Sequence, residues 1–182
     1  MLVATCAKEV VFFAFQNGVL KGSRGTGWGK SAKQEATLCH AFVDNTLITG
    51  QFSGPLLLWN GKSISKSIEA HTETCNAICN RVTKKGIITG GNDGAIIVWA
   101  FGGGGLQQEK KLDLKDQAIK SLSPKVRSVC EHTSGLILVG TRGGEIVEFG
   151  GAKPVVHLRS HFQDELWGLA PHPSKAEFVT VG

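Results

Sequence analysis

The sequence has no apolar run long enough to cross a membrane, because no segment approaches the roughly 18 uninterrupted apolar residues that a spanning helix requires. It also has no basic stretch followed by a long apolar run near its start, since Lys8 and Glu9 interrupt the first apolar segment. The five cysteines are odd in number and irregularly spaced, which does not fit a disulfide framework. We therefore expect a protein of a reducing, cytoplasmic compartment with no membrane partner.

Proline is scarce, with five residues, whereas glycine is abundant, with 24 residues in 182. Many glycines with few prolines are typical of tight turns between short elements. Apolar residues make up 41% of the chain and charged residues 19%, which is the composition of a protein with a hydrophobic core. These features predict a turn-rich, mostly β protein.

Acidic residues are fewer than basic ones, so the formal net charge is +5. An excess of positive charge favours acidic partners, which include both nucleic acids and acidic protein surfaces. Composition alone does not choose between the two.

The motifs of common enzyme classes are missing. The stretch GSRGTGWGKS at 22–31 is close to a phosphate-binding loop, but Arg24 stands where the first glycine of that motif belongs. No serine lies in a G-x-S-x-G elbow, and Glu145 and Glu148 are three apart on a strand, so they face opposite sides. We expect no enzymatic activity, no cofactor and no small-molecule substrate.

An internal repeat organises the chain. The segments ITGQFSGPLLLW at 48–59, ITGGNDGAIIVW at 88–99 and LVGTRGGEIVEF at 138–149 align without a gap, and each has the pattern of a β-hairpin. A looser copy lies at 2–13, and 178–182 matches the start of another. Shorter strand candidates precede and follow each hairpin.

Four short strands in each unit of about 40 to 50 residues are typical of a propeller blade. The sequence therefore predicts an all-β fold, an incomplete β-propeller with about three full four-stranded blades and two partial ones. We expect it to be part of a longer ring. The predicted units are a partial blade at 1–30, blades at 31–70, 71–120 and 121–160, and a partial blade at 161–182.

One unit resembles the WD-repeat pattern closely, through His71, Thr89, Asp93 and Trp99. The resemblance implies that these side chains form a hydrogen-bonded chain from tryptophan to threonine to histidine to aspartate. The other units keep parts of the pattern. The corresponding residues are Thr49, Ser53 and Trp59 in the first hairpin, Val139, Gly143 and Phe149 in the third, and His161 and Thr180 in the last unit.

Cys75 and Cys79 invite a metal-site interpretation, because His71 lies four residues upstream. In a strand, residues four apart lie about 13 Å apart on one face, too far to share one metal ion. We expect no metal. Cys39, Cys79 and Cys130 precede the hairpin glycines by ten or eleven residues, which predicts an equivalent packing position for all three.

The last part of the chain, SHFQDELWGLAPHPSKAEFVTVG from Ser160 on, resembles the H-x3-E-[LI]-W-G-L-A-x-H-P signature of the echinoderm microtubule-associated protein-like family. The resemblance extends over nearly the whole chain. It implies tandem WD-repeat propellers that associate with microtubules, hence tubulin or other cytoskeletal proteins as partners and a place on the cytoskeleton. The matching residues are His161, Glu165, Leu166, Trp167, Gly168, Leu169, Ala170, His172 and Pro173.

The glycine-rich stretch near GSRGTGWGKS also carries charge, since Lys21, Arg24, Lys30 and Lys33 have no acidic residue between them. One interpretation is that these are solvated charges of a flexible loop. The other is that glycines give reach to a cationic contact for the acidic surface of tubulin. We expect Trp28 to cover a neighbouring blade and not to bind nucleic acid. The alternative function is a general WD-repeat adaptor in a protein or RNA complex without microtubule binding, and a phosphate-binding enzyme is the third.

Overall fold

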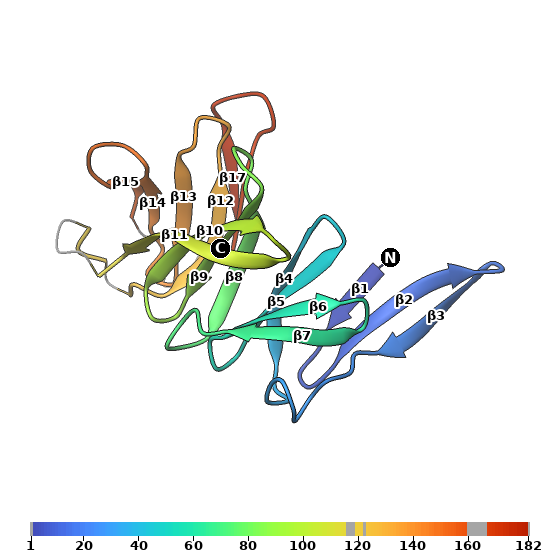
Figure 1. Ribbon diagram of the computed structural model, residues 1–182. Helices are drawn as coiled ribbons and strands as arrows, with labels where there is room; N and C mark the ends of the chain where they lie inside the picture. Colours follow the sequence, from blue (N-terminus) through green and yellow to red (C-terminus); the bar gives the residue numbers. More distant parts are fainter. Residues whose placement is uncertain (1, 116–118, 122, 160–166, 182) are drawn as a thin grey trace.

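The computed structural model consists of short β-strands joined by turns (Figure 1), and it describes residues 2–115, 119–121, 123–159 and 167–181. In these ranges no helix of a length and hydrophobicity suited to a membrane span occurs. The strands form five antiparallel sheets, and within each sheet the strands lie side by side in sequence order.

The strand bounds follow the repeat. Sheet 1 contains β1 (Leu2–Thr5), β2 (Val10–Gln16) and β3 (Val19–Arg24). Sheet 2 contains β4 (Thr37–Val43), β5 (Thr46–Gln51), β6 (Leu56–Asn60) and β7 (Ser63–Ile68). Sheet 3 contains β8 (Cys75–Asn80), β9 (Gly86–Gly91), β10 (Ala95–Gly102) and β11 (Gly105–Asp113). Sheet 4 contains β12 (Val126–Glu131), β13 (Ile137–Thr141), β14 (Ile146–Phe149) and β15 (Val155–Leu158). Sheet 5 contains β16 (Gly168–Pro171) and β17 (Phe178–Val181).

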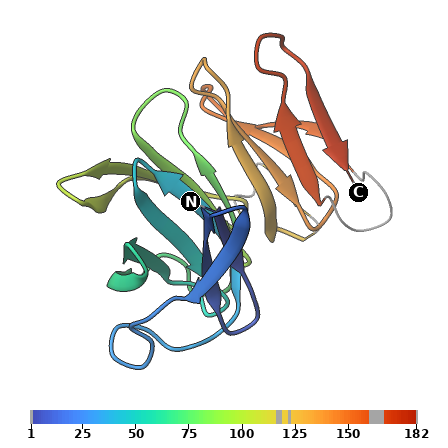
Figure 2. The ribbon, with the colours of Figure 1, turned by 90° about the vertical axis from the view of Figure 1, so that its right-hand side faces the viewer.

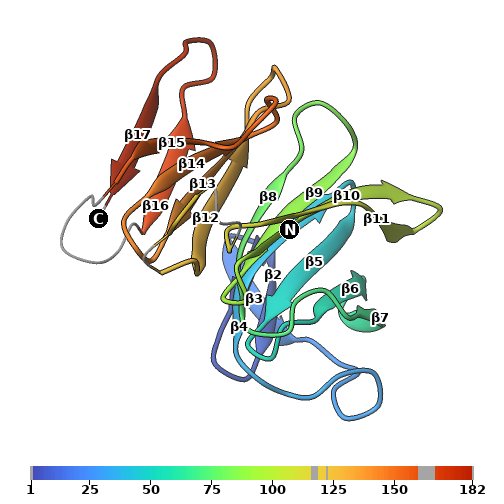
Figure 3. The ribbon, with the colours of Figure 1, turned by 90° about the vertical axis from the view of Figure 1, so that its left-hand side faces the viewer.

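Successive sheets pack face to face in an arc (Figures 2 and 3), with sheets 1 and 5 at its two ends. The first strands of neighbouring sheets contact one another, β4 with β8, β8 with β12 and β12 with β16, so these strands line the inside of the arc. This arrangement is that of a WD-repeat β-propeller that does not close into a ring. The all-β, incomplete-propeller fold expected from the repeat is confirmed.

Hydrophobic side chains fill the interfaces between sheets 1, 2, 3 and 4. Successive side chains of a strand point to opposite faces, so each sheet contributes to both of its neighbours. In sheet 2 the buried side chains directed toward sheet 1 include Leu47, Leu57 and Trp59. Those directed toward sheet 3 include Ile48, Leu56 and Leu58. We call the face of a sheet that is directed toward the preceding sheet its backward face, and the face directed toward the following sheet its forward face.

The looser copy at 2–13 aligns with the others only after a shift. Val3 pairs with Phe12 as Ile48 pairs with Leu58, so Val3 and not Leu2 occupies the position of Ile48. The reason is the turn, because residues 6–9 connect the paired strands in sheet 1 whereas residues 51–55 do so in sheet 2. A gapless alignment misses this one-residue difference.

Two expectations about the cysteines were wrong. Cys75 and Cys79 lie on opposite faces of sheet 3, because a bulge between Cys75 and Ala77 adds a residue and reverses the alternation. Cys39 is not equivalent to Cys79, since Cys39 pairs with Gly50 as Ala77 pairs with Gly90. The prediction counted residues back from the hairpin glycine, and it therefore assumed that the turn between the first two strands has the same length in every sheet. The turn after β4 is in fact shorter than the turn after β8.

Candidate functional site

The structure brings the four residues of the WD pattern together in sheet 3. Trp99 Nε1 donates to Thr89 Oγ1 at 3.0 Å, and Thr89 Oγ1 lies 2.9 Å from His71 Nε2. His71 Nδ1 lies 3.0 Å from Asp93 Oδ1. All four residues are buried. The Thr89 hydroxyl can accept from the indole and donate to Nε2, which leaves the Nδ1 proton for the carboxylate, so every group has a partner.

Asp93 fixes the β9–β10 turn to the loop that precedes β8. Its carboxylate also accepts from the backbone amides of Thr72 at 3.0 Å and Ala95 at 3.1 Å. Burial by itself raises the pKa of Asp93, but the hydrogen bond and charge interaction with His71 and the two amide bonds outweigh it. The net result is a pKa below the ordinary value of 3.8.

Sheet 2 builds a different network on the same frame. Trp59 Nε1 donates to Thr49 Oγ1 at 3.0 Å, as in sheet 3, but Gln51 Nε2 takes the place of histidine and donates to Thr49 at 2.9 Å. Gln51 aligns with Gly91, where a Cβ would lie 2.5 Å from His71 Nδ1. The glutamine side chain thus occupies the space that His71 fills in sheet 3.

In sheet 2 the acidic group that fixes the β5–β6 turn lies in the preceding loop and not in the turn itself. Ser53, in the aspartate position, donates through its amide at 3.0 Å and through its hydroxyl to Glu35 in the preceding loop. In sheet 4 the positions of threonine and tryptophan hold Val139 and Phe149, both buried. There the Thr141 hydroxyl contacts the buried Glu145 carboxylate, which also accepts from Ser121 at 3.0 Å. Sequence comparison missed Gln51, Glu35 and Glu145, because each acts from a position outside the pattern.

Glu131 at the end of β12 joins sheets 3 and 4. Its carboxylate accepts from the Thr83 amide at 3.0 Å and the Thr83 hydroxyl at 2.7 Å, in the turn between β8 and β9. Arg81 Nε lies 3.7 Å from the same carboxylate. Burial raises the pKa of Glu131, but the bonds from Thr83 and Val82 and the charge of Arg81 leave it below 4.5. No local sequence signal pointed to this residue.

The pKa values of Asp93 and Glu131 are lower in the folded chain than in the unfolded chain. The two carboxylates therefore contribute their full stabilisation above the unfolded-state pKa values, near pH 4. This stabilisation is lost as the pH falls through the folded-state pKa values. We expect the free energy of unfolding, measured with urea, to stay level from pH 7 to about pH 5 and to fall below about pH 4. In the variants Asp93→Asn and Glu131→Gln this fall should be shallower. Variants whose pH dependence matches the parent would contradict the assignment.

The family-motif residues lie in and around sheet 5. Gly168, Leu169 and Ala170 are in β16, and the indole of Trp167 lies 5.4 Å from the Arg127 guanidinium on β12. His172 starts the β16–β17 turn: its Nδ1 accepts from the amides of Ser174 and Lys175, both at 3.1 Å, and Pro173 follows it. Thr180 pairs with Leu169 in the sheet. His161, Glu165 and Leu166 lie outside the described residues.

The four basic residues of the glycine-rich stretch, Lys21, Arg24, Lys30 and Lys33, are all exposed. Lys21 and Arg24 belong to β3, and Lys30 and Lys33 lie in the connection to β4. Arg24 Nε lies 3.2 Å from Glu9 Oε2, an acidic neighbour that comes from an earlier turn. The stretch is therefore basic, with one of its charges partly balanced.

The expectation that glycines provide reach in this stretch was wrong for Gly25 and Gly27. A Cβ at Gly25 would lie 2.6 Å from the Trp59 ring, and one at Gly27 would lie 3.2 Å from Ile64. Trp28 packs edge-on against Trp59, with ring centroids 5.5 Å apart, and so covers sheet 2 as expected. Gly25 and Gly27 allow the backbone to approach sheet 2 closely, which holds this part of the connection against the sheet.

Comparisons with known proteins identify relatives over the full length. The chain is 30% identical to human echinoderm microtubule-associated protein-like 1 across 100% of its residues, which is 22% of that protein. It is 30% identical to human echinoderm microtubule-associated protein-like 4 across 98% of its residues, and 28% identical to the mouse protein-like 2 across 100%. These matches span 19% and 27% of the two relatives, so the chain covers about a quarter of their length or less. No family model matches.

Among solved structures, the WD40 β-propeller domain of Doa1 superposes with a TM-score of 0.61 over 83% of this chain and 47% of that one. The identity is 18%, so this likeness concerns the fold alone. Together with the hairpin repeat and the tryptophan–threonine–histidine–aspartate network, these matches confirm the family resemblance. The chain is a WD-repeat β-propeller protein related over its whole length to the echinoderm microtubule-associated protein-like family.

Proposed function

We propose that this chain is a non-catalytic scaffold that associates with microtubules in the cytoplasm through the surface of its sheets. The observation that carries the proposal is the similarity, over the full chain, to three proteins named as microtubule-associated. The net charge of +5 supports it, because a positive surface favours an acidic partner. Tubulin is the partner we propose, together with other cytoskeletal proteins.

We further propose that the basic segment, Lys21, Arg24, Lys30 and Lys33, contacts the microtubule. Its four side chains are exposed, and its backbone is held on sheet 2 by the Gly25 and Trp28 contacts with Trp59. Charges on a fixed backbone lose less conformational freedom on binding than charges on a mobile loop. Because Glu9 partly balances Arg24, the three lysines would contribute most.

Changing all four residues of the basic segment to glutamine should weaken microtubule binding by about tenfold or more at low salt, with folding intact. Four exposed charges are removed, and the attraction that they supply is screened over roughly 8 to 10 Å as salt rises. The measurement is co-sedimentation with taxol-stabilised microtubules across a series of salt concentrations. The salt dependence of the variant should also be shallower than that of the parent.

A matched control removes the same charge elsewhere, by changing Lys110, Lys111, Lys153 and Lys175 to glutamine, since all four are exposed and distant in sequence from the basic segment. This control should bind nearly as well as the parent. Equal loss in both variants would mean that net charge alone acts, and unchanged affinity in the first variant would reduce the basic segment to a connector.

The alternative is an adaptor in a protein or RNA complex without microtubule binding, and the propeller fold, which serves many binding functions, supports it equally. The two proposals differ in their response to RNA. An adaptor for RNA would be retained by single-stranded RNA in a filter-binding assay and would not pellet with microtubules. Radiolabelled ATP or GTP binding tests the phosphate-binding alternative, and we expect none, because Gly25 and Gly27 pack on sheet 2.

A further inference from the structure

Two cysteine side chains meet in the interface between sheets 2 and 3, although they lie 36 residues apart in the sequence. Cys39 Sγ on β4 lies 3.8 Å from Cys75 Sγ at the start of β8 and 3.4 Å from the Cys75 carbonyl oxygen. Both side chains belong to the apolar cluster between these two sheets. A disulfide has a sulfur–sulfur distance of about 2.05 Å, so the two sulfurs would have to approach by only roughly 1.8 Å.

The space that the two sulfurs share is provided by Gly50 on β5, which pairs with Cys39 in sheet 2. A Cβ at this position would lie 2.6 Å from Cys39 Sγ and 2.7 Å from Cys75 Sγ. Any larger residue would therefore displace one sulfur or both. The missing side chain of Gly50 thus allows the two thiols to lie in contact.

The equivalent place between sheets 3 and 4 has the same close packing and no sulfur. By the strand pairing, Ala77 takes the position of Cys39, and Val126 takes that of Cys75. A Cβ at Gly90 would lie 2.2 Å from Val126 Cγ1, so the backbone of one sheet approaches the next just as closely there. Alanine and valine fill this place and are buried. Packing therefore does not require cysteine at either position, and the chemistry of sulfur distinguishes the pair between sheets 2 and 3.

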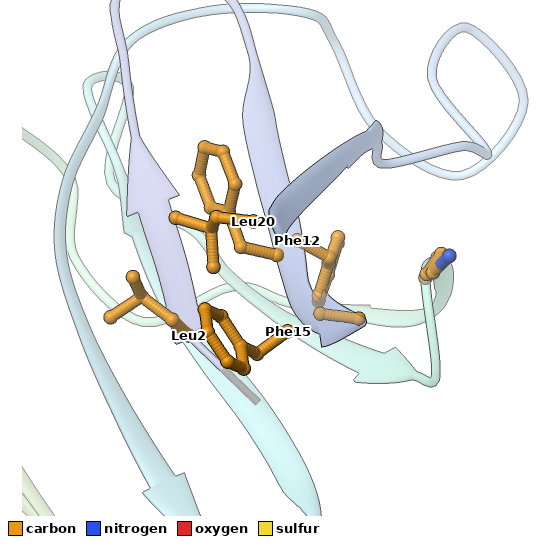
Figure 4. A pocket seen from close by; sticks show the side chains of 7 residues that line it. Leu2, Phe12, Phe15 and Leu20 are labelled. Atoms are coloured by element: carbon orange, nitrogen blue, oxygen red, sulfur yellow. The ribbon is translucent and has the colours of Figure 1, made fainter. Parts of the chain in front are cut away.

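The two thiols differ in their access to small molecules. Cys75 is 0% exposed, whereas Cys39 is partly exposed and lines a hollow of about 440 Å³ on the inside of the arc. The hollow on sheet 1, of about 640 Å³, has no sulfur among its lining side chains (Figure 4). The hydrogen bond with Cys39 and burial raise the pKa of the Cys75 thiol well above its ordinary range, which keeps this thiol protonated. A small oxidant therefore meets Cys39 first.

We propose that Cys39 and Cys75 form a reversible disulfide when hydrogen peroxide oxidises the chain, and that this bond ties sheet 2 to sheet 3. In the first step the Cys39 thiolate attacks one peroxide oxygen and the O–O bond breaks. The released hydroxide takes up the proton that the thiol had lost and leaves as water, so Cys39 becomes a sulfenic acid.

In the second step the Cys75 sulfur attacks the Cys39 sulfur and the S–O bond breaks, and hydroxide leaves with the Cys75 proton as water. The two sulfurs together lose two electrons, which reduce one peroxide to two molecules of water. A thiol reductant reverses the bond, as is usual for the transient disulfides of reducing compartments. The inference does not depend on microtubule binding.

Peroxide treatment of the chain with Cys6→Ser tests the proposal. Cys6 is exposed, and its removal prevents disulfides between copies. We expect two of the four remaining thiols to disappear in a titration of the denatured protein, mass spectrometry to find a peptide pair linked through Cys39 and Cys75, and dithiothreitol to restore both thiols. The oxidised chain should also unfold at a higher urea concentration than the reduced chain, because the bond closes a loop in the unfolded state.

Two variants borrow the residues of the next interface and so preserve the packing, which circular dichroism checks. Cys39→Ala should lose the disulfide and the rise in the urea midpoint, and its buried Cys75 should oxidise at least about tenfold more slowly than Cys39 does in the parent. Cys75→Val should stop after the first step, with a Cys39 sulfenic acid that a cyclic 1,3-diketone traps. As a control, Cys79→Ala in the neighbouring interface should form the disulfide as the parent does.

Three results would overturn the proposal. The first is that no thiol is lost at a peroxide concentration that oxidises Cys6 in the unmodified chain. The second is a disulfide that joins Cys79 and Cys130 instead. The third is oxidation of Cys39 to a sulfinic acid while Cys75 remains a free thiol, because the contact between the two sulfurs would then not lead to a bond.

Discussion

Replacing Trp99 with alanine is expected to lower the free energy of unfolding by about 3 to 5 kcal/mol. The side chain is 3% exposed and lies in the interface between sheets 2 and 3. Its loss leaves a large cavity and removes the donor at 3.0 Å from Thr89 Oγ1. Urea denaturation at pH 7, followed by circular dichroism, measures the change.

Two further variants separate packing from hydrogen bonding. Trp99→Phe keeps most of the ring and loses the indole donor, so it should cost about 1 to 2 kcal/mol. Asp93→Ala should cost less than Trp99→Ala, because it removes the last group of the network and leaves the packing of Trp99 in place. A loss below about 1 kcal/mol for Trp99→Ala would show that sheets 2 and 3 do not pack as described.

Gly54→Ala is expected to be strongly damaging for a single methyl addition, with a loss of about 3 kcal/mol or more, or failure to fold. A Cβ at this position would lie 2.1 Å from the backbone oxygen of His71 and 2.7 Å from that of Glu73. Backbone atoms cannot move aside as a flexible side chain can. The residue also has φ +113°, a conformation that L side chains rarely adopt.

Gly61→Ala is the matched control, because it combines a positive φ of +59° with open space around the added Cβ. Its cost should be only about 1 to 2 kcal/mol, which is the price of the left-handed conformation. Both variants are measured by urea denaturation. Similar losses for the two would mean that Gly54 does not lie against the loop before β8, and that sheets 2 and 3 are joined differently.

The fold could be predicted because two features of the repeat indicate it, the pattern of apolar residues and the spacing of glycines. A continuous apolar run, as in Leu56, Leu57 and Leu58 with partners on both sides, marks a strand buried on two faces. Glycines at fixed offsets mark the turns. The positions of His71, Thr89, Asp93 and Trp99 followed from the WD pattern, and their side chains lie within hydrogen-bonding distance of one another.

The features that the sequence did not predict depend on contacts between segments that are far apart in the sequence. The hydrogen bond of Glu131 to Thr83 joins residues 48 apart, and no periodicity indicates it. The bulge at Cys75 moves one cysteine to the opposite face without any change in the sequence pattern. Gly25 looked like a source of flexibility because its partner, the Trp59 ring, comes from the next sheet. In each case the partner, not the residue itself, determines the role.

Binding to microtubules is the central proposal, and co-sedimentation of the unmodified chain with taxol-stabilised microtubules tests it most directly. The measurement is the fraction pelleted over a range of tubulin concentrations at low salt, with and without a large excess of single-stranded RNA. We expect saturable binding that weakens as salt is added and that persists in the presence of RNA. A chain that remains in the supernatant at low salt, or one that RNA releases completely, would contradict the proposal.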